Sequence, residues 1–402
     1  MIPKHITLKQ LLKFAFIVFV LAIYFQLFFI HIYKGENLNK VLELTDYRAF
    51  FRAATMVHAG KISDLYTLDA QKKFQTELTS QDTEDGILSF RNPPLVAYVY
   101  SFLPINSYPK SFIYASICCN FLIFLSIIIL FTQVRVSYVQ LAIILMYLPV
   151  CWATLSGQTS AFILLSLVLI YVALKKQWYL LAGLLTFFLS LKPQYIIFIP
   201  AFLIITKKGF GKLLLGVIIT QATSVTLNII LYGKTFITDY FLFVINTEGA
   251  STGTRPGSNI NLFSLQPFAD KLFGGQVSFI VLLAVSLLLN VIFLLLLNQA
   301  KNSKPLPILF SSIIIMGLVL NVHTLFSDLS FLLIPLFLVL DKRKLGLDFL
   351  ILYFAPFLVL NEVNLQPAAF LLLMGCGFSI LSGNRKSWKS LLQTSTYRSI
   401  DS

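Results

Sequence analysis

The sequence predicts an all-α polytopic membrane protein with about 12 transmembrane helices, within a range of roughly 10 to 13. Hydrophobic residues make up 57% of its 402 positions and charged residues only 12%, and the mean hydropathy is +0.82. A water-soluble domain of this length and composition would expose large apolar patches. The hydrophobic residues also gather in long runs, and Lys and Arg fall mainly in alternate gaps between those runs.

The apolar runs have spanning or near-spanning length. They cover residues 11–31, 111–132, 138–156, 159–174, 178–191, 194–206, 213–232, 276–298, 305–322, 328–340, 346–360 and 365–382. We expect 178–191, 194–206 and 328–340 to be broken or tilted, because they are short for a full span. The first run is too long for a signal peptide and lacks a small-residue cleavage site, so we expect it to remain as the first membrane helix.

The distribution of charge predicts the topology. With a cytoplasmic N-terminus, 18 of the 31 Lys and Arg residues but only three of the 17 Asp and Glu residues fall in cytoplasmic segments. The positive-inside rule therefore places both termini in the cytoplasm of a multi-pass protein of the bacterial cell membrane. The formal charge of +14 could also indicate nucleic-acid binding, but its spread over short gaps favours orientation in the membrane, and no nucleic-acid partner is expected.

We expect residues 1–402 to form a single integral membrane domain. Two extracytoplasmic loops are too long to be turns: 32–110, with helical periodicity that indicates amphipathic helices, and 233–275, rich in Gly, Ser, Thr and Asn, which could order over a ligand. Residues 383–402 would form a cytoplasmic tail. All four cysteines lie within apolar runs, a pattern that fits neither a disulfide framework nor a metal site.

Unusual polar residues gather where the predicted helices meet the outer surface. Polar groups at membrane depth are costly and mark candidate functional sites. The residues are Asp46, Arg91, Asn92, Gly157, Gln158, Lys192, His323 and Asp328. Because they all fall on one predicted face, they indicate a common site.

Each residue also has a purely structural interpretation. Asp46 could cap the helix predicted to begin at Tyr47, and Lys192 could be a snorkelling anchor. His323 could be an interfacial hydrogen-bond donor, while Gly157-Gln158 and the Arg91-Asn92-Pro-Pro stretch could serve as turns. The shared face, and no single residue, supports a functional site.

Glycosyl transfer from a phosphate leaving group to a hydroxyl suits this set of residues. The reaction needs a general base for the hydroxyl proton, which Asp46 could supply, and cations or donors for the departing phosphate. Those could come from Lys192, Arg91, Arg255 and His323. Because nucleotide sugars are cytoplasmic, a donor used on the outer face would have to be carried on a lipid. The sequence has no D-x-D motif for a metal-bound nucleotide, so we expect no cofactor and no divalent metal.

At these residues the sequence resembles glycosyltransferase family 87, a group of GT-C type membrane enzymes that use polyprenyl-phosphate sugars and include alpha-mannosyltransferases. The resemblance covers nearly the whole chain. It rests on an Asp-Tyr pair followed by a small-residue helix and G-x(4)-LY, then N-P-P, S-G-Q-T-S, L-K-P-Q and H-T-x(3)-D elements. These contain Asp46, Tyr47, Ala53, Ala54, Gly60, Tyr66, Pro93, Pro94, Pro104, Gly157, Gln158, Gly183, Lys192, Pro193, Gln194, His323 and Asp328.

The resemblance implies a GT-C fold and an inverting hexosyltransferase, with mannose as the first guess for the sugar. The acceptor would be lipid-linked or another cell-envelope glycan. Asp46 would be the catalytic base, and Lys192 and the His323 element would line the lipid-phosphate pocket. Tyr47, Asn92, Gln158 and Asp328 would have supporting roles.

Two alternatives remain open on the sequence. A transporter or lipid flippase would also have many spans and broken helices. It should, however, show ionisable groups near the middle of the bilayer and a hydropathy repeat, and neither is evident. A GT-C transferase that moves another sugar, such as arabinose or glucose, is indistinguishable at this level.

Overall fold

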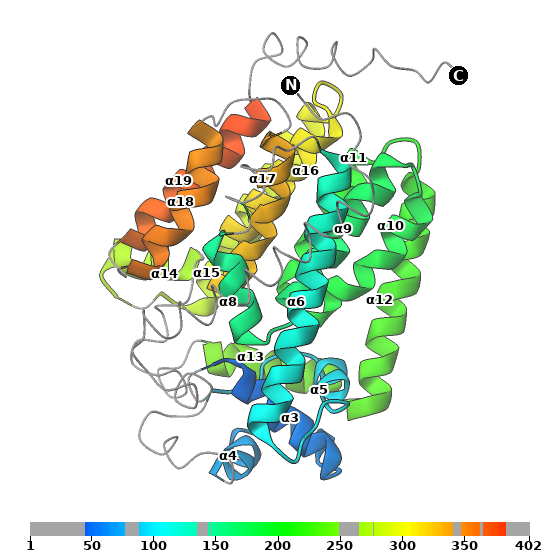
Figure 1. Ribbon diagram of the computed structural model, residues 1–402, viewed down its shortest axis with the longest axis vertical. Coiled ribbons are helices and arrows are strands. Elements are labelled where there is room, and N and C mark those ends of the chain that lie inside the picture. Colours follow the sequence, from blue (N-terminus) through cyan, green and yellow to red (C-terminus); the bar gives the residue numbers. More distant parts are fainter. Residues whose placement is uncertain are drawn as a thin grey trace.

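The computed structural model of the chain is a bundle of helices with a layer of short helices at one end (Figure 1). It describes residues 45–76, 88–134, 144, 146–248, 265–275, 277–340, 347–361 and 365–382. No strand occurs within these ranges. The predicted first span at 11–31, Arg255 and the predicted tail at 383–402 lie outside the described residues.

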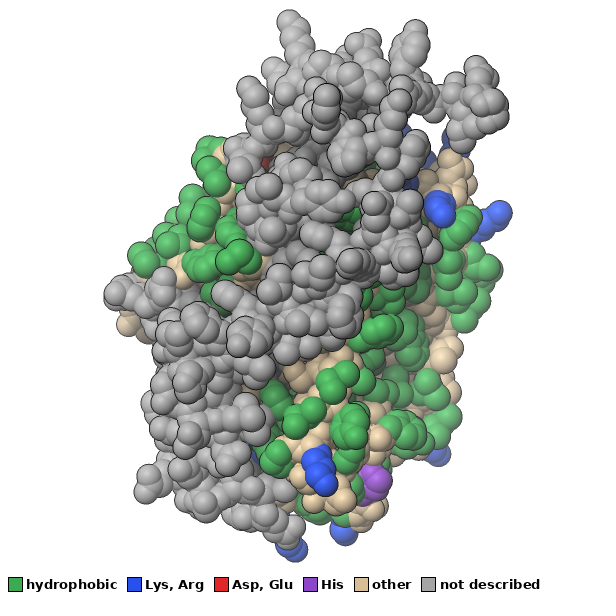
Figure 2. Space-filling model, viewed as in Figure 1, with side chains coloured by type: hydrophobic (Ala, Val, Ile, Leu, Met, Phe, Trp, Pro, Cys, Tyr) green, Lys and Arg blue, Asp and Glu red, His purple; other side chains and the backbone are tan. Residues whose placement is uncertain are grey.

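Three helices are long and apolar enough to cross a membrane: α6 (Tyr108–Gln133), α12 (Phe210–Tyr232) and α15 (Phe279–Ala300). Many of their apolar side chains are exposed, and Ile218, Leu288 and Leu295 are more than half exposed. Figure 2 shows hydrophobic side chains along the visible flank of the bundle and Lys and Arg near its two ends. An exposed apolar band between charged ends is typical of a membrane protein.

The remaining apolar runs form shorter helices. They are α8 (Leu148–Ser156), α9 (Ser160–Lys175), α16 (Leu306–Val319), α18 (Leu347–Asn361) and α19 (Gln366–Ser382), with α14 (Leu265–Phe273) packed beside α19. Of these helices, all but α14 overlap a run predicted from the sequence. The membrane class is therefore supported, while the number of about 12 transmembrane helices stays a prediction.

The three runs expected to be broken do change helix type. The first is divided into α10 (Tyr179–Leu185) and the 3-10 helix η2 (Thr186–Leu191), the second into η3 (Pro193–Ile197) and α11 (Phe198–Ile205), and the third into η5 (Phe326–Leu332) and α17 (Leu333–Leu340). Between η2 and η3, Lys192 is extended, with φ −130° and ψ 91°. The following Pro193 favours this conformation, because its ring disfavours helical geometry in the residue before it.

The helices pack closely where small residues face each other. A Cβ on Gly183 of α10 would collide with the carbonyl oxygen of Leu213 of α12, and one on Gly216 of α12 would collide with that of Leu180. Only glycine allows the two backbones to approach so closely, as is common between membrane helices. The tight crossing fixes α10, and with it the chain that leads into η2 and Lys192.

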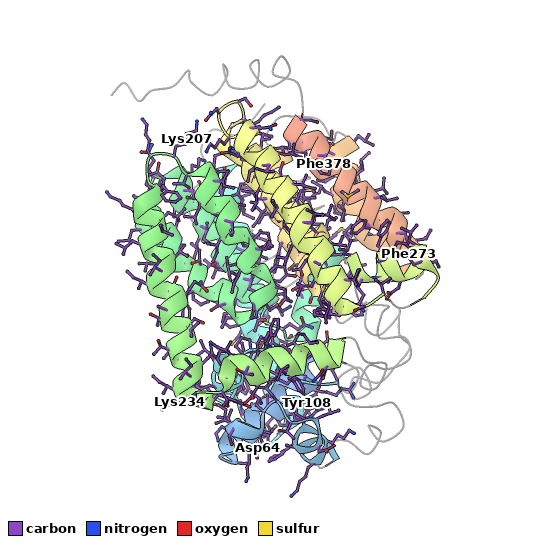
Figure 3. All side chains as sticks on the ribbon, turned by 180° about the vertical axis from the view of Figure 1, so that it is seen from behind. Asp64, Tyr108, Lys207, Lys234, Phe273 and Phe378 are labelled. Atoms are coloured by element: carbon purple, nitrogen blue, oxygen red, sulfur yellow. The ribbon has the colours of Figure 1, made fainter. Side chains whose placement is uncertain are left out.

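Short helices form the layer at one end. They are α3 (Tyr47–His58), η1 (Ile62–Asp64), α4 (Leu68–Thr76), α5 (Pro94–Tyr100) and α13 (Phe236–Glu248). Seen from behind, α13 lies across the end of the bundle, and Asp64, Tyr108 and Lys234 are at this end while Lys207 is at the other (Figure 3). These three residues of segments predicted to be extracytoplasmic thus lie at the end opposite Lys207, which is predicted to be cytoplasmic. The orientation of the bundle in the cell stays a prediction.

Candidate functional site

Gln158 lies at the centre of the polar cluster, in the turn between α8 and α9. The turn is made by Gly157, whose φ of 59° is in the left-handed region that disfavours other residues. A Cβ at Gly157 would lie 2.8 Å from Cδ2 of Tyr47, so the turn also packs against α3. The buried hydroxyl of Tyr100 donates a hydrogen bond to the Gly157 carbonyl oxygen at 2.7 Å. These contacts hold the buried Gln158 side chain against the start of α3.

Asp46 is the half-buried residue that precedes α3. It occupies the N-cap position, but its side chain makes no capping hydrogen bond. Instead, Nε2 of Gln158 donates a hydrogen bond to Oδ2 of Asp46. The carboxylate is therefore directed into the polar cluster, and capping does not explain its position.

Lys192 and Asp328 form a buried ion pair next to Gln158. Their side chains are 3% and 0% exposed, and Nζ lies 2.6 Å from Oδ1. Nζ also donates to Oε1 of Gln158 and to Oγ of Ser160, both at 3.0 Å. The snorkelling interpretation of Lys192 does not fit this placement, because a snorkelling ammonium group reaches water.

Two serines complete the cluster. Ser160, the first residue of α9, donates to Oδ1 of Asp328 at 2.6 Å, and Ser327 of η5 donates to Oε1 of Gln158 at 2.9 Å. The second oxygen of Asp328 accepts a hydrogen bond from the backbone N–H of Leu325 at 3.1 Å. We did not predict either serine from the sequence, although Ser160 closes the S-G-Q-T-S element and Ser327 directly precedes Asp328.

The electrostatics of Asp46 involve two opposing effects. Burial raises the pKa of its carboxyl above the ordinary value. Lys192 and Arg48, the hydrogen bond from Gln158, and His323 each act to lower it. His323 therefore lies within electrostatic range of Asp46. Its backbone N–H donates to Oδ1 of Asn321 at 3.2 Å.

Arg91 and Asn92 contact the layer of short helices. Nη2 of Arg91 donates to the carbonyl oxygen of Thr247, near the end of α13, at 3.1 Å. The carbonyl oxygen of Asn92 accepts a hydrogen bond from the hydroxyl of Tyr66 at 3.0 Å. These contacts tie the segment before α5 to α13 and to the chain after η1. The structure thus gives both residues a structural contact, and their predicted roles toward a donor stay predictions.

Two further residues support this segment. Asn228 of α12 accepts a hydrogen bond from the backbone N–H of Leu95 at 2.8 Å and so satisfies one of the unpaired N–H groups at the start of α5. The hydroxyl of Tyr47 lies 2.6 Å from Oγ of Ser111 in α6, and the side chain of Tyr47 is fully buried. Asn228 was not predicted from the sequence, because nothing local distinguishes it from other polar residues of α12.

Within the described ranges, no three His, Cys, Asp or Glu residues are placed to hold a metal ion. Arg255, predicted to bind the donor phosphate, lies outside the described residues. The cluster around Gln158 can orient a carboxylate and stabilise its charge, and it lies at the end of the bundle where α3 meets the broken helices.

The chain was compared with models of protein families. The family model described as Glycosyltransferase family 87 matches residues 90–327, more than half of the chain. No curated protein and no solved structure gives a significant match. The matched segment contains Gln158, Lys192 and His323 and ends one residue before Asp328, while Asp46 precedes it.

Proposed function

The chain belongs to glycosyltransferase family 87 and is a membrane glycosyltransferase, and from this premise we propose its reaction. It transfers a hexose from a polyprenyl-phosphate-linked donor to a lipid-linked or cell-envelope acceptor. Mannose is the first candidate for the sugar, and the reaction inverts the anomeric configuration. Asp46 is the general base.

The position of Asp46 carries this proposal. Its Oδ2 accepts a hydrogen bond from Gln158, whereas Oδ1 has no hydrogen-bond partner among the described residues. The side chain is half-buried, so an acceptor hydroxyl can reach it. A carboxylate held on one oxygen and accessible at the other is suited to take a proton from an incoming hydroxyl group.

We propose that transfer occurs in a single displacement at the anomeric carbon. The acceptor oxygen forms a bond to the anomeric carbon while the bond from that carbon to the phosphate oxygen breaks. The hydroxyl proton passes to Asp46, and the electron pair leaves with the polyprenyl phosphate. His323, within electrostatic range of Asp46, is one proposed group for the phosphate charge, and Arg91 and Arg255 are the others.

We place the reaction on the extracytoplasmic side. The layer of short helices lies at the end opposite Lys207 (Figure 3), and the charge of the sequence assigns that end to the outside. A cysteine introduced at the exposed Lys61 of a cysteine-free variant should react with an impermeant maleimide added to spheroplasts. One introduced at Lys207 should react only after the membrane is opened, and the reverse pattern would move the site to the cytoplasm.

Sugar transfer is tested with the purified protein in nanodiscs. Polyprenyl-phosphate donors that carry labelled mannose, glucose or arabinose are each incubated with a lipid extract, and the labelled glycolipid is measured. We expect one donor to support transfer and the Asp46→Asn protein to support almost none. Movement of labelled donor across a liposome membrane without any new glycolipid would favour the flippase alternative.

A further inference from the structure

We propose that Lys192 and Asp328 form a buried pair that positions the amide of Gln158, and through it the carboxylate of Asp46. Lys192 and Gln158 are then positioning residues that act on the base, and Lys192 is not a ligand of the donor phosphate. This inference rests on the proposed function, in which Asp46 is the base.

The hydrogen bonds determine which way the Gln158 amide faces. Its Oε1 accepts from Nζ of Lys192 at 3.0 Å and from Oγ of Ser327 at 2.9 Å. An ammonium group can only donate. If the amide were flipped, the N–H groups of Gln158 would face the N–H groups of Lys192, with no acceptor between them. The N–H group of Gln158 must therefore face Asp46.

The bonds of Lys192 argue against direct phosphate binding. Its ammonium group has three N–H bonds and three acceptors, on Gln158, Ser160 and Asp328. Its charge is balanced by Asp328, and only 3% of the side chain is exposed. Binding a phosphate would require Lys192 to give up one of these acceptors and would weaken its pairing with a fully buried carboxylate, which is strongly unfavourable.

The broken helices account for the geometry of this network. Lys192 lies in the extended break between η2 and η3, Asp328 lies in η5, and Gln158 follows the left-handed Gly157. In a continuous helix these side chains would be directed by the helix repeat alone. The breaks instead bring three distant segments to the residue that precedes α3.

The network has a predictable effect on the ionisation of Asp46. The N–H of Gln158 and the charge of Lys192 both favour the carboxylate form and lower its pKa, against the effect of burial. Removing the N–H should therefore raise the pKa of Asp46. Because a base must be deprotonated, the acidic limb of the pH–rate profile should move to higher pH.

The test compares Gln158→Leu with Gln221→Leu. Gln221 provides a matched control, because its Nε2 donates to the carbonyl oxygen of Thr186 at 3.2 Å, outside the network. Carbodiimide modification of Asp46 is followed against pH by mass spectrometry of the labelled peptide, with the exposed Asp69 as an internal reference. We expect the pH of half-modification to rise by about one to two units in Gln158→Leu only.

Lys192 is tested by kinetics with the polyprenyl-phosphate donor. The double variant Lys192→Met/Asp328→Leu removes both buried charges, so that neither remains unpaired. We expect its kcat to fall about 10-fold to 100-fold with the KM for the donor unchanged and the acidic limb at higher pH. A raised donor KM with an unchanged acidic limb would overturn the inference and return Lys192 to the phosphate pocket.

The outcomes separate this inference from the proposed function. A shift in Asp46 modification in a protein that transfers no sugar would support the network and contradict the proposed reaction. Sugar transfer by the wild type, with no shift in Gln158→Leu, would overturn the network alone. If Gln158→Leu does not fold, Ser327→Ala removes one of the two bonds to Oε1 and should shift the modification in the same direction by a smaller amount.

Discussion

Some polar side chains of the helix bundle bond only within their own helix, whereas those of the proposed site bond to distant segments. Inside the bundle, Ser126 donates to the carbonyl oxygen of Leu122 at 2.8 Å, and Asn290 donates to that of Ser286 at 2.8 Å. Each bond stays within one helix and spans four residues. At the site, Gln158 bonds to Asp46 across 112 positions and Lys192 bonds to Asp328 across 136.

The two kinds of bond have different consequences for the fold. A serine or asparagine that bonds to its own helix fulfils its hydrogen-bonding capacity without constraining distant segments. A side chain bonded to side chains of other segments depends on the whole fold and constrains it. Changes in the bundle should therefore affect stability alone, whereas changes at the site should also affect catalysis.

The largest effect is expected at Asp46. Asp46→Asn should lower turnover about 10²-fold to 10⁴-fold, because the amide cannot accept the proton of the acceptor hydroxyl. The melting temperature should barely change, since Asp46 makes no capping bond that asparagine would lose. Retention of near wild-type transfer in a well-folded Asp46→Asn protein would falsify the catalytic assignment and direct attention to His323.

The next prediction concerns the contribution of the buried Lys192–Asp328 pair to stability. Asp328→Ala leaves the charge of Lys192 buried and unpaired, which should destabilise the protein by about 3–5 kcal/mol. Adding Lys192→Met should recover much of this loss, because no buried charge then remains. Thermal unfolding in detergent measures both variants, and a double variant no more stable than Asp328→Ala alone would show that the pair does not dominate the stability of this region.

Substitutions at two glycines test the comparison between the bundle and the site. Gly183→Ala forces α10 away from α12 and should cost about 1–3 kcal/mol of stability, with turnover reduced only as far as the folded fraction is reduced. Gly157→Ala adds about 1–2 kcal/mol of backbone strain, and its Cβ would meet Tyr47. We expect turnover per folded molecule to fall in Gly157→Ala alone, and equal specific activities would contradict the distinction between the two regions.

An effect on stability alone, no larger than that of Gly183→Ala, is expected at Asn228. Asn228→Leu leaves the N–H of Leu95 without its acceptor and should cost about 1–3 kcal/mol, measured as a lower melting temperature. The control Asn290→Leu removes a bond within a single helix and should cost less, because the Ser286 carbonyl oxygen keeps its place in the helix. A larger loss for Asn290→Leu would reverse the expected order.

Much of the architecture follows from local sequence patterns. The long apolar runs correspond to α6, α12 and α15, and the break at Lys192-Pro193 is a direct consequence of the proline. Asp46, Gln158, Lys192 and Asp328 come together from the set predicted to lie at one face, whereas Arg91 and Asn92 of that set bond elsewhere. Hydropathy and the conformational preferences of turn residues act over a few neighbouring residues. Their structural consequences can therefore be predicted without knowledge of the fold.

Hydropathy and charge in the sequence alone determined that this is a helical membrane protein, because the bilayer requires apolar side chains and internally satisfied backbone. Which polar groups bond to one another was decided only by the tertiary structure. The pairing of Lys192 with Asp328, the carboxylate of Asp46 bonded to Gln158 instead of capping α3, and the contributions of Ser160, Ser327 and Asn228 all join segments far apart in the chain. Such bonds depend on the relative placement of whole helices, which no local pattern of residues encodes.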